Sequence, residues 1–314
     1  MICTDTFLIT VYVLVDEFCK QNPPKPEEQT LWQTGRKRGL SRAEVVTLSI
    51  FGQWSRFRSE RDFWSFCEQR LRTLFPSLPD RAEFVRAQQR FQPTVVGFAL
   101  HLASQLGADD AAYEVIDRCG IATRMCGRRG RDWMGGFANR GLCGRLGFFW
   151  GLQLMCAVTR EGVITGFAVA PGSTKDQPMA ESLFAARDRR DPALPSAGKP
   201  PRSRCYIVDR GFSGPRRKRE WKQRYHVDVI GPPQKGHGEP WPREWQSWVA
   251  HLRQIVETVH DRLVNFFRLG RERPHCMEGF QARLAAKAAL HNFCIWLNRQ
   301  HGRPGLQFAD LLGW

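Results

Sequence analysis

The pattern of apolar residues changes near Tyr113, and this change constrains the fold more than any other feature of the chain. Before it, apolar side chains recur at helical spacing, Ser41 and Glu44 have the spacing of a capping box, and no convincing alternating strand is found. After it, segments typical of strands and of helices alternate. We predict strands at 113–117, 147–159, 163–169, 204–209 and 226–230, and helices at 176–187, 215–224, 245–269 and 280–297. The chain is therefore predicted to have a helical domain that ends near Gly107, followed by an α/β domain.

The chain is strongly basic. It has 47 Lys and Arg against 31 Asp and Glu, which gives a net charge of +16 and an isoelectric point near 9.9. Much of the excess lies in two arginine-rich stretches, 118–145 and 199–224. Because arginine forms forked contacts with phosphate oxygens, a polyanionic partner is expected, although a solvated basic surface would have the same composition. Charge alone does not assign a function.

One apolar run near the start of the chain, 7–15, is too short to span a membrane. Asp5 and Asp16 flank it and no basic segment precedes it, so it does not resemble a secretion signal. We interpret it as part of a buried helix in a cytoplasmic protein. The ten cysteines are scattered without zinc-binding spacing, and we expect them to be reduced thiols.

Three acidic residues occupy positions where their charge needs an explanation. Asp117 and Asp209 each end a short apolar strand, where a carboxylate is costly unless a metal or another cation partners it. Taken singly, each could instead be a turn or cap residue. Glu257 lies at the edge of the apolar stripe of helix 245–269, and there it could simply pair with Arg253 and Asp261 in an exposed row of ions. The stripe itself is expected to be buried and consists of Trp248, Leu252, Ile255, Val256, Val259, Leu263 and Phe266.

Together the three acids resemble the signature of DDE transposases encoded by bacterial insertion sequences. The matching segments are Val115-Ile116-Asp117, Ile207-Val208-Asp209-Arg210-Gly211-Phe212 and Arg253-Gln254-Ile255-Val256-Glu257. The resemblance implies an RNase H-like α/β fold, a mixed β-sheet flanked by helices, with the first acid on the central strand, the second beside a neighbouring strand and the third on a helix. The helical N-terminal segment and helix 280–297 also resemble small insertion-sequence transposases. We therefore expect an all-α N-terminal domain at 1–107 and a catalytic domain at 108–314 that includes the C-terminal helix.

The resemblance is incomplete on the acidic helix. Larger relatives carry Tyr, Arg, Glu and Lys at fixed steps there, whereas this chain has Ala250, Arg253, Glu257 and Val264. Only Arg and Glu are kept, which favours a sister group and leaves the DNA-handling roles of the absent Tyr and Lys unassigned. Asp176, which follows the predicted third strand, resembles a polar position of the family, and we interpret it first as a helix N-cap with a supporting role possible.

The resemblance implies a metal-dependent reaction on double-stranded DNA. Asp117, Asp209 and Glu257 would hold two Mg²⁺ or Mn²⁺ ions, which prefer oxygen ligands, and such a pair suits phosphodiester transfer. Water would first cut the ends of the insertion sequence, and the released 3′-hydroxyl would then attack target DNA. The chain would act on the element ends and on the target as a homo-oligomer, expected to be a dimer, associated with the bacterial nucleoid.

Basic residues near the acids are the candidates for phosphate contacts: Arg210, Arg216, Arg217, Lys218 and Arg253. Arg36, Lys37 and Arg38 could add contacts from the N-terminal domain, which is expected to recognise element ends or to pair subunits. His260, near Glu257, is expected to lie at the surface. Two alternatives remain open: a nuclease on the same fold that never joins DNA, and a transposase-derived DNA-binding protein that has lost catalysis.

Overall fold

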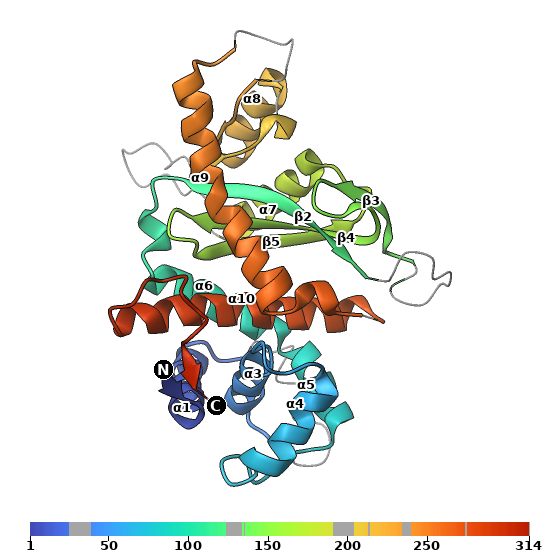
Figure 1. Cartoon of the computed structure of the whole chain (residues 1–314), viewed down its shortest axis with the longest axis vertical. Helices are drawn as coiled ribbons and strands as arrows, with labels where there is room; N and C mark the ends of the chain where they lie inside the picture. Colours follow the sequence, from blue (N-terminus) through green and yellow to red (C-terminus); the bar gives the residue numbers. More distant parts are fainter. Residues whose placement is uncertain are drawn as a thin grey trace. The chain divides into compact units, whose positions relative to one another are not determined.

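The computed structural model divides the chain into two compact units (Figure 1). Unit 1 comprises Met1–Gln105, Phe266–Arg268 and Pro274–Trp314, and unit 2 comprises Leu106–Asn265 and Leu269–Arg273. The structure describes residues 1–24, 39–123, 134, 136–190, 204–212, 214–233, 240–273 and 275–313. The basic residues predicted to touch DNA from the N-terminal domain, Arg36, Lys37 and Arg38, lie outside the described residues.

Unit 1 consists mainly of helices and also contains one pair of short strands. Its helices are α1 (Thr4–Gln21), α3 (Arg42–Phe51), α4 (Glu60–Phe66), α5 (Arg81–Arg90), α6 (Gln92–Gln105) and α10 (Met277–Gln300). Two short parallel strands, β1 (Ile2–Cys3) and β8 (Leu312–Gly313), join the ends of this unit. The predicted capping box is confirmed, because the amide of Glu44 donates to Ser41 Oγ at 3.2 Å and the amide of Ser41 donates to Glu44 Oε2 at 2.6 Å.

The C-terminal helix α10 forms the core of unit 1. Most of its side chains between Phe280 and Asn298 are buried, and it packs against α3, α5 and α6. One of its buried polar groups bonds within the unit: Lys287 Nζ donates to Gln53 Oε1 at 2.7 Å. A helix that is apolar on all sides needs neighbours on all sides. For this reason the C-terminal residues belong with the N-terminal helices, and the predicted assignment of the C-terminal helix to a domain at 108–314 differs from the structure.

Unit 2 contains a mixed sheet, which has six strands in the described part of the chain. They are β2 (Glu114–Ala122), β3 (Asn139–Cys143), β4 (Gly147–Thr159), β5 (Ile164–Pro171), β6 (Arg204–Ile207) and β7 (Val227–Ile230). The order is β3-β4-β2-β6-β7, with β5 paired to β4. β2 runs antiparallel to β4 and parallel to β6, so it is the central strand, as predicted.

Helices cover both faces of this sheet. One face packs against α7 (Asp176–Arg190) and α8 (Pro215–Tyr225), in a core that includes Ile116, Phe184 and Tyr206. The alternation of side chains along a strand turns Val115 and Ile207 to the other face. There α9 (Arg243–Asp261) runs across the sheet and contacts β2, β4 and β6 (Figure 1). The predicted fold class, a mixed sheet flanked by helices, is confirmed.

Some boundaries differ from the predictions for identifiable reasons. β2 continues to Ala122, beyond the predicted end at residue 117, because its pairing with the long β4 continues. β3 was not predicted, since Asn-Arg-Gly-Leu-Cys has no alternating apolar pattern. The prediction that Trp248 is buried is wrong: it is 53% exposed, and the buried face of α9 passes through Val249 instead. None of the described helices has the length and apolar character that crossing a membrane requires.

Candidate active site

The register between the two parallel central strands brings Asp117 and Asp209 together. β2 and β6 pair over only two positions, Glu114 with Tyr206 and Val115 with Ile207. Asp117 and Asp209 each follow the second pair by two residues, on the face turned toward α9. Both carboxylates therefore lie where the paired strands separate, and the sequence prediction that adjacent strands place them side by side agrees with this register.

Asp117 is held by groups from two elements. Its Oδ1 accepts a hydrogen bond from the amide of Arg118 at 2.8 Å, and its Oδ2 forms an ion pair with Arg253 Nη2 of α9 at 2.9 Å. The side chain of Asp117 is 17% exposed, so the partly buried charge is compensated by a guanidinium group that is itself mostly covered. Arg253, predicted as a DNA contact, thus binds a carboxylate of the acidic cluster in this structure.

Asp209 lies in the tight turn that follows β6. Its Oδ1 accepts from the amide of Gly211 at 2.8 Å, within the 3-10 turn Arg210–Phe212. Burial raises the pKa of the Asp209 carboxyl, and the nearby negative charge of Asp117 raises it further, against the opposing effect of Arg253. Asp117 is therefore close enough to Asp209 to oppose its ionisation.

A third carboxylate in this cluster comes from Asp176, the first residue of α7. It forms an ion pair with the side chain of Arg118. Burial raises the pKa of Asp176, and the charges of Asp209 and Asp117 act in the same direction. From the sequence, Asp176 was interpreted first as a helix cap. The signal for a place in the cluster was its position five residues after the end of β5, a strand of the same sheet.

Glu257 has a different environment from the other predicted acids. It is exposed on α9, one turn beyond Arg253, and it makes no hydrogen bond or ion pair among the described residues. In the part of the chain that the structure describes, no three His, Cys, Asp or Glu side chains converge as a metal-binding group. The sequence allowed an exposed ion pair between Glu257 and Arg253. The structure does not have this pair, because the side chain of Arg253 binds Asp117 instead. The role of Glu257 as a ligand stays a prediction.

The donor atoms of the cluster, though not their positions in this structure, fit a divalent cation. Three carboxylates, Asp117, Asp176 and Asp209, face two guanidinium groups, and the pKa of two of these acids is raised partly by mutual repulsion. All the available donors are oxygen atoms, which Mg²⁺ and Mn²⁺ prefer. A cation bound between the carboxylates would relieve their repulsion.

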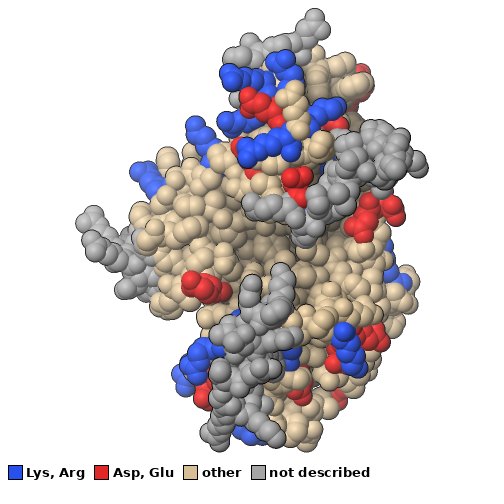
Figure 2. All heavy atoms as spheres, turned by 180° about the vertical axis from the view of Figure 1, so that it is seen from behind, with Lys and Arg blue, Asp and Glu red and all other residues tan. Residues whose placement is uncertain are grey.

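The predicted DNA-contacting residues lie on and around α8. Arg216 is almost fully exposed and pairs with Glu220 at 3.0 Å, while Arg217 donates to Gln177 Oε1 at 2.6 Å. Lys218 is half-buried, donates to the carbonyl of Gly231 at 3.4 Å, and has a pKa lowered by burial. Arg210, on the turn after Asp209, donates to Gln246 Oε1 at 2.9 Å. Figure 2 shows lysine and arginine side chains gathered around the region of α8, at the top of the view.

His260 was expected at the surface, and this prediction is wrong. The ring is on the buried side of the last turn of α9, and burial, assisted by the charge of Arg145, lowers its pKa to about 4. A neutral imidazole suits this apolar location, because a charged one would be poorly solvated there.

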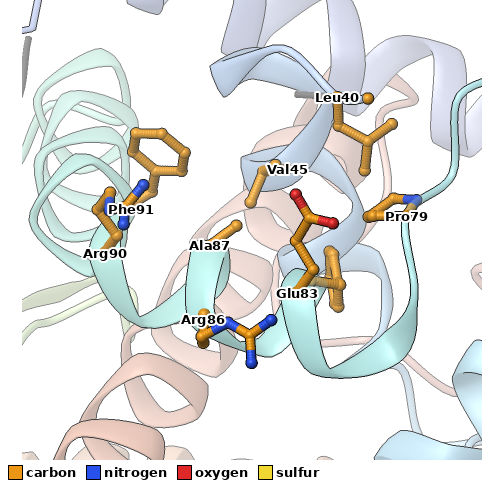
Figure 3. Close-up of a pocket in the computed structure, with 10 residues that line it drawn as sticks. Leu40, Val45, Pro79, Glu83, Arg86, Ala87, Arg90 and Phe91 are labelled. Atoms are coloured by element: carbon orange, nitrogen blue, oxygen red, sulfur yellow. The ribbon is translucent and has the colours of Figure 1, made fainter. Parts of the chain in front are cut away.

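A pocket of about 190 Å³ lies in unit 1, between α3 and α5. Figure 3 shows Glu83 and Arg86 beside the apolar side chains of Val45 and Pro79. All its lining residues belong to unit 1, so the pocket shares no residue with the acidic cluster.

Comparison with known proteins gives one match. A family model described as a transposase DDE domain matches residues 124–293, which is more than half of the chain. Asp176, Asp209 and Glu257 lie inside the matched range, and Asp117 precedes it. No curated protein and no solved structure matches the chain.

Proposed function

The chain belongs to the transposase DDE-domain family, and we propose that it cuts DNA at the ends of an insertion sequence and joins those ends to target DNA. The observation that carries the proposal is the placement of Asp117 and Asp209 where β2 and β6 separate, with Arg253 of α9 beside them. Partly buried acids on and beside neighbouring strands, facing a helix, suit phosphodiester chemistry on an RNase H-like core.

In this proposal, Asp117, Asp209 and Glu257 hold two divalent cations, Mg²⁺ or Mn²⁺. When bound, such ions activate an attacking oxygen and stabilise the leaving oxygen of a phosphodiester. Two features suit these residues to divalent cations: their donors are oxygen atoms, and the charge of Asp117 repels that of Asp209. Glu257 would join them through a change of its exposed side chain, since it has no partner to give up among the described residues.

Arg253 has two roles in this proposal. Without a cation it compensates the charge of Asp117, at 2.9 Å. If a cation compensated Asp117 instead, the guanidinium of Arg253 would be able to contact a DNA phosphate.

The basic residues on and before α8 hold the DNA backbone. Arg216 and Arg217 are exposed, so their charges can reach phosphates without a rearrangement of the core. Arg210, directly after Asp209, and Lys218, directly after Arg217, provide further contacts. Because phosphate contacts fix the register of a duplex without reading its bases, we infer that the residues up to 107 recognise the element ends or pair two subunits on them.

The exposed position of Glu257 favours one alternative, a transposase-derived protein that binds DNA without cutting it. A duplex carrying the terminal repeats that flank the coding sequence separates the possibilities. With pre-cut ends and Mn²⁺, a transposase gives joined products, a nuclease gives only shorter fragments, and a binding protein gives a shifted band with no new ends. Absence of joined products, with cleavage retained, would refute strand transfer while leaving metal-dependent hydrolysis in place.

A further inference from the structure

We propose that Asp176 is a metal ligand of the catalytic site, in addition to Asp117, Asp209 and Glu257, and shares a divalent cation with Asp209. This proposal rests on the proposed function, because it assumes that the acids around Asp117 bind metal. It assigns a role to a residue outside the three acids identified from the sequence.

The geometry around Gly211 carries this proposal. A Cβ atom placed on Gly211 would stand 2.8 Å from Asp176 Oδ2 and 3.0 Å from Asp209 Oδ1. One oxygen comes from the start of α7 and the other from the turn after β6. Both approach the same point, so they are at most 5.8 Å apart. Two ligands of one Mg²⁺, each about 2.1 Å from the ion, are separated by about 4 Å or less. The two oxygens would therefore have to move closer together to share one ion.

The start of α7 is fixed against the turn that follows Asp209. Gln177 Nε2 donates to the carbonyl of Gly211 at 3.2 Å, and Gln177 Oε1 accepts from Arg217 at 2.6 Å. Behind them, Met179 and Ala180 are buried in the core between α7 and the sheet. Asp176 is therefore held beside Asp209 by the fold and does not depend on its own side chain for its position.

The partners of Asp176 leave one oxygen directed at the cluster. Arg118 binds Oδ1, and its Nη1 also donates to the carbonyl of Thr174 at 3.2 Å, which anchors the segment before α7. Of the atoms around a Cβ placed on Gly211, Asp176 Oδ2 is the nearest and Asp209 Oδ1 is the next. If Asp176 served only to anchor Arg118, the carboxylate of Asp209 beside it would add repulsion without any benefit.

The test measures Mn²⁺ binding to the DNA-free protein by electron paramagnetic resonance, in the native protein and in Asp176→Asn, Asp209→Asn and Asp188→Asn. Asparagine keeps an oxygen that accepts from Arg118 but removes the charge, so a purely anchoring role is preserved. We expect Asp176→Asn and Asp209→Asn each to weaken Mn²⁺ binding by about tenfold or more. Asp188→Asn, on the same helix but away from the cluster, is the matched control and should bind as the native protein does.

Native affinity for Mn²⁺ in Asp176→Asn, with binding lost in Asp209→Asn, would overturn this proposal and leave the proposed function intact. No Mn²⁺ binding by the native protein would overturn both. A second measurement needs no variant: Fe²⁺ with ascorbate and peroxide should cut the native backbone near Asp176 as well as near Asp209. Cuts near Asp117 and Asp209 alone would contradict a role for Asp176.

Discussion

Replacing Arg187 by methionine should strongly destabilise unit 2. The guanidinium of Arg187 on α7 forms a buried ion pair with both carboxylate oxygens of Glu114, with one contact at 2.8 Å, and it also donates to Tyr206 Oη and to the carbonyl of Thr165. Glu114 and Tyr206 are the first register pair of β2 and β6, three residues before Asp117 and Asp209 respectively. This network therefore joins α7 to the two strands that position the acids.

The expected loss is about 3–5 kcal/mol of unfolding free energy, because removing one partner leaves a buried charge uncompensated. The double variant Glu114→Gln/Arg187→Met should be more stable than Arg187→Met alone, since no charge then remains. Arg216→Met is the matched control: Arg216 is 90% exposed in an ion pair with Glu220, and surface pairs contribute about 0–1 kcal/mol. Urea denaturation of the three variants and the native protein measures these differences.

The effect should also depend on pH in a defined direction. Burial opposes ionisation of Glu114, but the charge and hydrogen bonds of Arg187 outweigh it, so the pKa of Glu114 is lowered in the folded protein. The stabilisation is complete above the unfolded-state value of about 4.3 and is lost as the pH falls through the lower folded value. The difference between native and Arg187→Met should therefore be large at neutral pH and shrink in acid. An Arg187→Met variant as stable as Arg216→Met at neutral pH would refute this reasoning.

Three further results are expected. Gly211→Ala should reduce Mn²⁺-dependent cleavage severely, because its Cβ would displace two carboxylates of the cluster. Gly144→Ala, where a Cβ meets no atom within 4 Å, is the control and should cleave normally. Equal cleavage rates for both variants would contradict the close approach of the two carboxylates to Gly211. Changing both Arg216 and Arg217 to alanine should weaken DNA binding on any sequence and reduce the salt-dependence slope by about two in a filter-binding titration, and an unchanged slope would remove α8 from the DNA interface. Ser41→Ala should cost about 1 kcal/mol of unfolding free energy in thermal or urea unfolding through loss of the helix cap, and a change near zero would mean that the cap contributes nothing in this context.

The order of elements in unit 2 could be predicted because it depends on local patterns. Apolar runs that end at Asp117 and Asp209 mark strands, and Pro215 at the start of a basic segment marks the helix that follows. The position of α10 could not be predicted in the same way. Its apolar character predicts burial, but burial against distant N-terminal helices depends on tertiary packing that no local pattern encodes.

In the candidate site, too, some features could be predicted from local sequence patterns and others could not. Asp117 and Asp209 could be identified because a carboxylate at the end of an apolar strand needs a reason. Asp176 was interpreted first as a helix N-cap, with a supporting role as the alternative, because its position at a helix start has an ordinary explanation in capping. The pairing of Arg253 with Asp117 could not be foreseen either, since residues four apart on a helix, such as Arg253 and Glu257, are the pair that sequence spacing favours.

Cleavage of a labelled duplex carrying the terminal repeat, in Mg²⁺ or Mn²⁺, tests the central claim most directly. The native protein should cut at the repeat end, while Asp117→Asn, Asp209→Asn and Glu257→Gln should bind the same duplex in a gel-shift assay and leave it uncut. Undiminished cleavage by Asp117→Asn or Asp209→Asn would contradict the account, because the two acids that meet between β2 and β6 would then not carry the reaction.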